Sequence, residues 1–241
     1  MKKIFAKVLI LVLFAGFAAC DDEEVVADAA GDAFIVSKLT GVGLEADTVY
    51  GLALHAFGNK SFSAVTAKAP DNTSFTLKSY NGYTYDYYYE TEEDEFVATL
   101  PDEGNYTFAC SFTTGESVTA ADELSDDVLY PVNITKAVYD DTDSRIELEW
   151  TSEEDDVDYY VIFMENDDDD IVYVSQALAG TVDDFNISSS TYTWVNGETP
   201  ENGMTYKVSI NAYMYETAAG ADLNIQAKSI ATASVVWNPA D

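Results

Sequence analysis

Few residues in this chain have side chains that could act as a nucleophile, a general base or a transition-metal ligand. The sequence contains one histidine, His55, and two cysteines, Cys20 and Cys110. A nucleophile needs a base beside it, and a structural zinc site needs about four nitrogen or sulfur ligands. The sequence has no glycine-rich phosphate loop and no Gly-x-Ser-x-Gly elbow. We therefore expect no enzymatic activity and no resident cofactor, and we expect His55 at the surface or edge of a strand.

Carboxylates are abundant, and they gather in three segments that we expect to be loops, at 140–143, 153–156 and 166–170. Hard oxygen donors crowded on loops suit Ca²⁺. No segment has the spacing of an EF-hand, so a calcium ion would bind weakly, and the alternative is that these charges are simply solvated. The candidate calcium ligands are Asp141, Asp143, Asp155, Asp168 and Asp170.

Tyrosines occupy alternate positions after the Asn81-Gly82 pair. This pair favours a type I′ hairpin turn, and the period of two along a strand places alternate side chains on one face. Four phenol rings on one face form either the inner layer of a sandwich or an exposed platform that stacks on sugar rings or packs on a partner. The residues of this candidate ligand platform are Tyr83, Tyr85, Tyr87 and Tyr89.

The first 19 residues have the composition of an export signal. Three lysines lie within the first seven residues, and the apolar stretch at 8–14 is far shorter than the ~20 residues that span a bilayer. Small residues then lead to Cys20. This pattern resembles the lipobox of bacterial lipoproteins, which implies cleavage after residue 19, acylation of Cys20 by groups such as palmitate, and an anchor that does not span the membrane. The alternative is an ordinary secretory signal in which Cys20 has no role.

Four acidic residues, 21–24, follow Cys20 directly. This run resembles the export signal of Bacteroidetes-type surface lipoproteins, which implies a lipid-anchored protein of the outer membrane that faces the cell exterior. The alternatives are a solvated acidic linker or, in an enterobacterial setting, retention at the inner membrane. With the small residues that come next, we predict a lipidated acidic tether over residues 20–33.

The charge of the chain excludes one class of partner. It carries 44 acidic and 11 basic side chains. Three basic residues belong to the predicted signal, which leaves 44 against 8 and a net charge of −36. Such a surface repels nucleic acid, so we expect no nucleic-acid partner. If Cys20 is acylated, no disulfide can form within the chain, and the domains must depend on their hydrophobic cores.

The remaining sequence predicts strands. Short runs rich in Val, Thr, Tyr and Phe are separated by Gly, Asn, Asp and Pro, and no stretch keeps a helical period over three turns. The strands predicted from these runs include 95–100 and 145–151. The spacing predicts an all-β protein of two tandem sandwiches, 34–130 and 131–241, because acidic and turn-forming residues at 122–131 separate them.

Residues 102–110 are similar to the Asp-x-Gly-x-Tyr-x-Cys motif of immunoglobulin-like domains. The resemblance implies that Tyr106 forms a tyrosine corner, in which its hydroxyl bonds to the backbone just upstream. Phe108 replaces the disulfide cysteine of that family. Cys110 shares a face with Tyr106 and Phe108, so we expect a buried thiol with no reactivity.

Residues 131–238 resemble a fibronectin type III domain. Trp150 stands at the position of that family's strand-B tryptophan, Tyr160 at its strand-C aromatic residue, and Tyr206 at its tyrosine corner. The leucine usual before the corner is missing, so we expect the turn to differ in detail.

These observations predict a non-enzymatic surface lipoprotein of the outer membrane, which acts as a binding or accessory module in glycan or peptide uptake. The expected partners are the membrane, through the lipid, and an outer-membrane transporter, another surface protein or a glycan. The alternative is a structural spacer or adhesin element without a small-molecule site.

Overall fold

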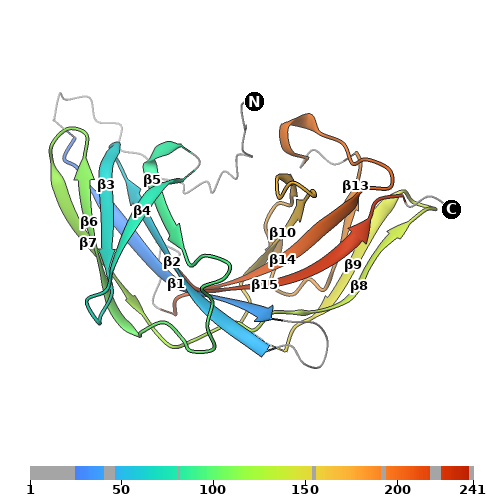
Figure 1. The fold of residues 1–241 in the computed structure, drawn as a ribbon, viewed down its shortest axis with the longest axis horizontal. Helices are drawn as coiled ribbons and strands as arrows, with labels where there is room; N and C mark the ends of the chain where they lie inside the picture. The colour runs from blue at the N-terminus through green and yellow to red at the C-terminus, as the bar shows by residue number, and fades with distance from the viewer. Residues whose placement is uncertain are drawn as a thin grey trace.

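The computed structural model describes residues 25–40, 47–80, 82–153, 156–190, 194–217 and 224–238 (Figure 1). Within these ranges the chain is all-β, as predicted, and the one helical element is a 3-10 turn, η2 (Val195–Gly197). None of the described helical residues forms a segment long and apolar enough to cross a membrane. The predicted signal peptide, Cys20 and Asp155 lie outside the described residues.

Seven strands build a first unit. They are β1 (Ala29–Thr40), β2 (Asp47–Gly58), β3 (Phe62–Lys68), β4 (Ser74–Tyr80), β5 (Tyr83–Glu90), β6 (Gly104–Phe112) and β7 (Ser117–Leu124). The first half of β4 pairs with β3 and its second half pairs with β5. The strand therefore switches layers, and it joins a β1-β2-β5 layer to a β3-β6-β7 layer.

Alternation along β6 supplies much of the core of the first unit. Tyr106, Phe108, Cys110 and Phe112 are buried, whereas the residues between them are exposed or half-buried. From the other layer, Leu54 and Ala56 of β2 point into the same core. Burial of these apolar side chains between the two layers is the driving force for this packing.

Eight strands build a second unit. They are β8 (Asn133–Asp140), β9 (Arg145–Thr151), β10 (Tyr159–Glu165), β11 (Ile171–Val174), β12 (Leu178–Ala179), β13 (Asp184–Ser188), β14 (Thr205–Tyr215) and β15 (Ile225–Val236). A three-stranded sheet, β13-β9-β8, packs on the strands β11-β10-β14-β15. Trp150 from β9 meets Tyr160 from β10 across the core, with ring centroids 5.3 Å apart. The unit is therefore a sandwich of two sheets.

The two units share one continuous sheet. The first strand, β1, pairs in parallel with the last strand, β15, from the Ile35–Ala227 pair to the Lys38–Ile230 pair. Figure 1 shows β1 and β15 meeting at the middle of the molecule, where the two units diverge. The hydrophobic cores nevertheless stay separate, and Leu129, just before the predicted boundary, already packs in the second core.

Three local features differ from the strand and tether predictions. β1 begins at Ala29 and its residues 31–37 are buried, so the predicted tether of 20–33 overlaps the strand by five residues. The segment 95–100, predicted as a strand, forms only a bridge between Val97 and Tyr50, and β13 lies in a segment that was not predicted. Small residues such as those at 29–33 resemble a linker in sequence, but here they allow close packing against aromatic rings.

Candidate functional site

The four tyrosines of the predicted platform divide into two pairs. Tyr87 and Tyr89 pack against the first core, whereas Tyr83 and Tyr85 are 47% and 52% exposed. The reason is that β5 pairs with β2 only from Asp86 onward, so the two earlier tyrosines extend past the end of the core. Among the described residues, no ring contact and no hydrogen bond of their side chains holds Tyr83 or Tyr85 in place.

The exposed tyrosines lie at the end of the first unit where the described chain begins. We call this surface the proximal end and define it by Val25, Val26, the turn 59–61, Tyr83 and Tyr85. The Asn59 side chain donates a hydrogen bond to the Val26 carbonyl (2.8 Å), and the Ser61 and Thr84 hydroxyl oxygens are 2.9 Å apart. Val25 and Val26 are 64% and 78% exposed, so the proximal end presents four exposed apolar or aromatic side chains.

Both predicted corner tyrosines bond to backbone atoms just upstream. The Tyr106 hydroxyl donates to the carbonyl of Asp102 (2.9 Å), and the Tyr206 hydroxyl accepts from the amide of Glu201 (2.9 Å). The near-complete burial of the Cys110 thiol raises its pKa to about 11. A thiol with so high a pKa carries almost no thiolate at neutral pH, so Cys110 serves as a core residue.

His55 is buried, contrary to the expectation of a surface or edge position. It does point away from Leu54 and Ala56, but Phe57, Tyr80 and Tyr88 cover its ring, and Asp86 bonds to Nε2. Alternation correctly indicated which face His55 occupies. It gave no sign that large side chains on that face would cover it.

The same outer face of the sheet carries tyrosines of the second unit. Tyr159 and Tyr213 stack with ring centroids 4.6 Å apart, and Tyr215 lies 5.4 Å from Tyr159. Burial raises the pKa of Tyr213, and the charge of Glu90 on β5 raises it further. Glu90 also pairs with Lys228 of β15 at 3.5 Å. Side chains as well as β1–β15 pairing therefore connect the two units.

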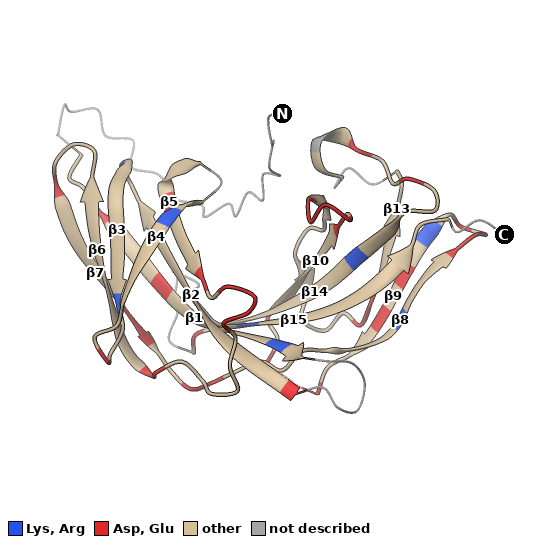
Figure 2. Ribbon diagram, in the orientation of Figure 1, with Lys and Arg blue, Asp and Glu red and all other residues tan. Residues whose placement is uncertain are grey.

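The structure does not bring together the four predicted calcium ligands that it describes. Asp141 and Asp143 lie in the β8–β9 turn, Asp168 and Asp170 in the β10–β11 turn, and among the described residues none of them belongs to a group of three carboxylates. Figure 2 shows acidic residues spread over the loops and strand ends of both units. Each turn forms internal hydrogen bonds: the Asp140 side chain accepts from the amide at 142, and the Asn166 side chain accepts from the amides at 168 and 170.

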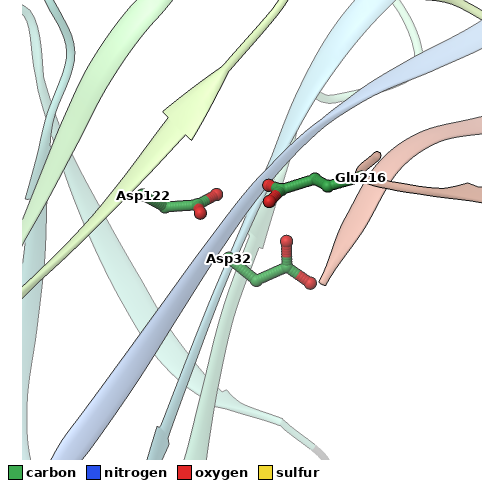
Figure 3. Close-up of side chains that lie close together, drawn as sticks. All are labelled: Asp32, Asp122 and Glu216. Atoms are coloured by element: carbon green, nitrogen blue, oxygen red, sulfur yellow. The ribbon is translucent and has the colours of Figure 1, made fainter. Parts of the chain in front are cut away.

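A different group of carboxylates converges near the junction of the two units. Asp32 on β1, Asp122 on β7 and Glu216, just after β14, each place one carboxylate oxygen within 4.8 Å of the others. Figure 3 shows the three carboxyl groups pointing toward one another. No sequence motif predicts this group, because its members are far apart in the sequence and none stands in a run of acidic residues with a recognisable spacing. The small residues around Asp32, at 29–33, show no alternation of polar and apolar side chains, so the local sequence carries no signal of a strand there.

Burial and mutual repulsion disfavour the charged forms of these three side chains. The pKa of Asp32 is raised well above its usual value, first by burial and then by the charge of Asp122. Burial also raises the pKa of Asp122. Burial and the neighbouring Asp122 raise the pKa of Glu216 to about 7. Such perturbed carboxylates at one place mark a candidate site for a proton or a cation.

No protein-family model matches the chain, and no curated protein matches its sequence. Among solved structures, a two-domain fibronectin type III segment from chicken tenascin is 12% identical with a TM-score of 0.30, over 76% of this chain and 91% of that one. Tp47, the 47-kilodalton lipoprotein of Treponema pallidum, is 11% identical with a TM-score of 0.37, over 84% of this chain and 50% of that one.

The adhesin domain of Epf from Streptococcus pyogenes is 12% identical with a TM-score of 0.30, over 80% of this chain and 74% of that one. Of the structures named here, Tp47 is the one of which this chain spans only about half the length. The likeness is confined to the kind of β-rich domain, and at these values it carries no conclusion about function.

Proposed function

We propose that this protein is a non-enzymatic lipoprotein of the outer-membrane surface that binds a membrane-embedded partner through its proximal end. The observation that carries the proposal is the position of Tyr83 and Tyr85, which are exposed at the end where the described chain begins. Tyrosines supply large contact area and a polar hydroxyl, and they are enriched at protein interfaces.

The length of chain between the predicted anchor and the first unit supports this orientation. Cys20 precedes Val25 by five residues, which span about 17 Å when fully extended. An acyl group on Cys20 would therefore hold the proximal end close to the bilayer. Tyr83 and Tyr85 would then face the membrane and the proteins embedded in it.

Charge favours a protein over lipid headgroups as the contact. A net charge of −36 on the mature chain opposes close approach to anionic lipid. An outer-membrane transporter is the class of partner that fits, with this protein as its accessory subunit in glycan or peptide uptake.

The test compares capture of the partner by wild-type protein and by the double variant Tyr83→Ala/Tyr85→Ala. From detergent-solubilised outer membrane, we expect the acylated variant to capture at least tenfold less transporter than the acylated wild type. The matched control, Val138→Ala/Ile171→Ala, removes exposed apolar surface from the second unit and should capture as the wild type does. Equal capture by wild type and the tyrosine variant would contradict the proposal.

Two further measurements separate the anchor and the glycan from the protein partner. Mass spectrometry of the mature amino terminus should find an acylated Cys20, and protease treatment of intact cells should remove the protein. If purified glycans bind the wild type but not the tyrosine variant, and no transporter is captured, then Tyr83 and Tyr85 bind a glycan and not a protein partner.

The continuous sheet supports a second candidate, a rigid spacer or adhesin element. The β1–β15 pairing makes the two units one elongated body. In that case, deletion of the protein would abolish cell attachment, while the tyrosine variant would behave as the wild type and a glycan array would give no hits.

A further inference from the structure

Three carboxylates from three separate elements converge near the β1–β15 junction. Asp32 and Asp122 come from opposite layers of the first unit, and Glu216 comes from the end of β14 in the second unit. The Glu216 backbone is fixed because its amide donates to the Asn224 carbonyl (3.0 Å). The group is therefore built by two strands, β1 and β7, and by the residue that follows β14 (Figure 3).

The existing hydrogen bonds leave this group incompletely satisfied. Asp122 accepts from the Ala33 amide (2.8 Å) and from the Asn224 side chain (3.2 Å), and Asp32 Oδ2 accepts from the Ile225 amide (3.3 Å). Asp32 is only 6% exposed, and its Oδ1 has no hydrogen-bond partner. Figure 3 shows an oxygen of Asp32 directed at the carboxyl group of Glu216. A buried carboxylate oxygen without a partner costs free energy, so a missing partner is indicated.

No basic side chain neutralises the group. The eight basic residues of the mature chain are all described, and none of them, nor His55, forms an ion pair with Asp32, Asp122 or Glu216. Three carboxylates this close together cannot all remain charged without a counter-charge.

A shared proton relieves the group only in part. A proton on Glu216 or on Asp122 would allow a hydrogen bond between these two side chains, whose carboxylate oxygens lie within 4.8 Å of each other. That proton leaves Oδ1 of Asp32 without a partner. A divalent cation at the centre would be bound by all three carboxylates and would offset their repulsion.

The donor set selects the kind of cation. All three ligands are carboxylate oxygens, with no sulfur or nitrogen donor among them, which favours a hard cation. Calcium takes about six to eight oxygen ligands in a flexible geometry, whereas magnesium demands a near-ideal octahedron and is usually held by one or two carboxylates, so a group of three protein carboxylates favours calcium. The three oxygens lie within 4.8 Å of one another.

We propose that Asp32, Asp122 and Glu216 bind one Ca²⁺ ion, which fastens β1 and β7 of the first unit to the end of β14 in the second. Water molecules complete the coordination of the ion. This inference does not depend on the proposed binding partner, since it concerns how the two units are held together.

The test uses the full mature chain and measures calcium binding by calorimetry and melting temperature in CaCl₂ or in EDTA. We expect the wild type to bind one Ca²⁺ per chain and to melt at a higher temperature in CaCl₂. Asp32→Asn should weaken binding at least tenfold and abolish the calcium-dependent rise. In EDTA this variant should melt no lower than the wild type, because it removes one of three repelling charges, so a loss of folding cannot account for its loss of binding.

Two further variants and a second readout locate the ion. Glu216→Gln should reproduce the effect of Asp32→Asn, whereas Asp141→Asn and Asp168→Asn, in exposed turns, should bind calcium as the wild type does. Hydrogen exchange at the amides of Ala33 and Ile225 should slow in CaCl₂, because both amides donate to carboxylates of the group.

Three results would overturn the proposal. The first is a wild-type melting temperature that is the same in CaCl₂ and in EDTA. The second is binding by Asp32→Asn within twofold of the wild type, or loss of binding in Asp141→Asn or Asp168→Asn, which would move the ion to the turns. The third is a larger response to MgCl₂ than to CaCl₂, which would reject calcium as the cation.

Discussion

Gly31 offers a sharp test of whether β1 belongs to the first core. A Cβ atom added at Gly31 would lie 2.2 Å from Cδ2, 2.5 Å from Cε2 and 2.7 Å from Cγ of Phe108. Phe108 is fully buried, so its ring cannot move aside into solvent. Overpacking of this kind costs about 1–3 kcal/mol. The lower chain entropy of alanine in the unfolded state returns about 0.5–1 kcal/mol.

We expect a packing cost of about 3 kcal/mol, at the top of that range, because the ring must move by about 1 Å. After the entropy gain of about 1 kcal/mol is subtracted, Gly31→Ala should lower the free energy of unfolding by about 2 kcal/mol. Urea denaturation followed by far-ultraviolet circular dichroism measures this change. Ala30→Val, at an exposed neighbouring position of β1, is the control and should stay within about 0.5 kcal/mol of the wild type.

A double-mutant cycle identifies the contact responsible. Phe108→Leu alone should cost about 1–2 kcal/mol by loss of packing. The destabilisation of the double variant Gly31→Ala/Phe108→Leu should be smaller than the sum of the two single destabilisations by about 1 kcal/mol or more. The reason is that the smaller leucine side chain leaves room for the new methyl group. An unfolding free energy for Gly31→Ala equal to that of the wild type would refute the packing of β1 and would restore the tether over 20–33.

Two further predictions concern the first core. Tyr106→Phe removes a buried hydrogen bond of 2.9 Å to the turn at 102 and should lower the free energy of unfolding by about 1 kcal/mol, measured by the same denaturation; no change would show that the corner is unimportant for stability. Burial holds the pKa of Cys110 at about 11, so a thiol reagent at pH 8 should modify it only at the rate of unfolding, in protein whose Cys20 is acylated or replaced by serine. Rapid modification without denaturant would contradict its burial.

Alternation predicted much of the fold, because strands such as β6 and β9 bury one face and leave the other at the surface. The strand 145–151, with Ile146, Leu148 and Trp150 inward, was predicted with the bounds that the structure has. Alternation also put Tyr87 and Tyr89 on the same face as Tyr83 and Tyr85, but it does not say where the core under a strand ends. The core ends beneath β5 between these pairs, so Tyr83 and Tyr85 are exposed whereas Tyr87 and Tyr89 are partly buried.

The parallel β1–β15 pair and the carboxylate group could not be predicted in the same way. An antiparallel hairpin has a turn between its strands that the sequence reveals, whereas Ile35 and Ala227 are joined by nothing local. Asp32 and Asp122 meet within the first unit, and Glu216 joins them only after that pairing has formed. The acid-rich turns drew attention in the sequence because their charges are adjacent, although adjacent charges on exposed turns are easily solvated.

The β1–β15 pairing also sets the order in which the molecule can be completed. Ile35 leaves the ribosome, and crosses any membrane, about 190 residues ahead of the Ala227 that will cover it. Until then the free side of β1 is an unprotected strand edge with backbone amides and carbonyls available to a neighbouring chain. A chain shortened before residue 225 would keep that edge open permanently, so truncated forms should self-associate through β1 while the complete chain remains monodisperse.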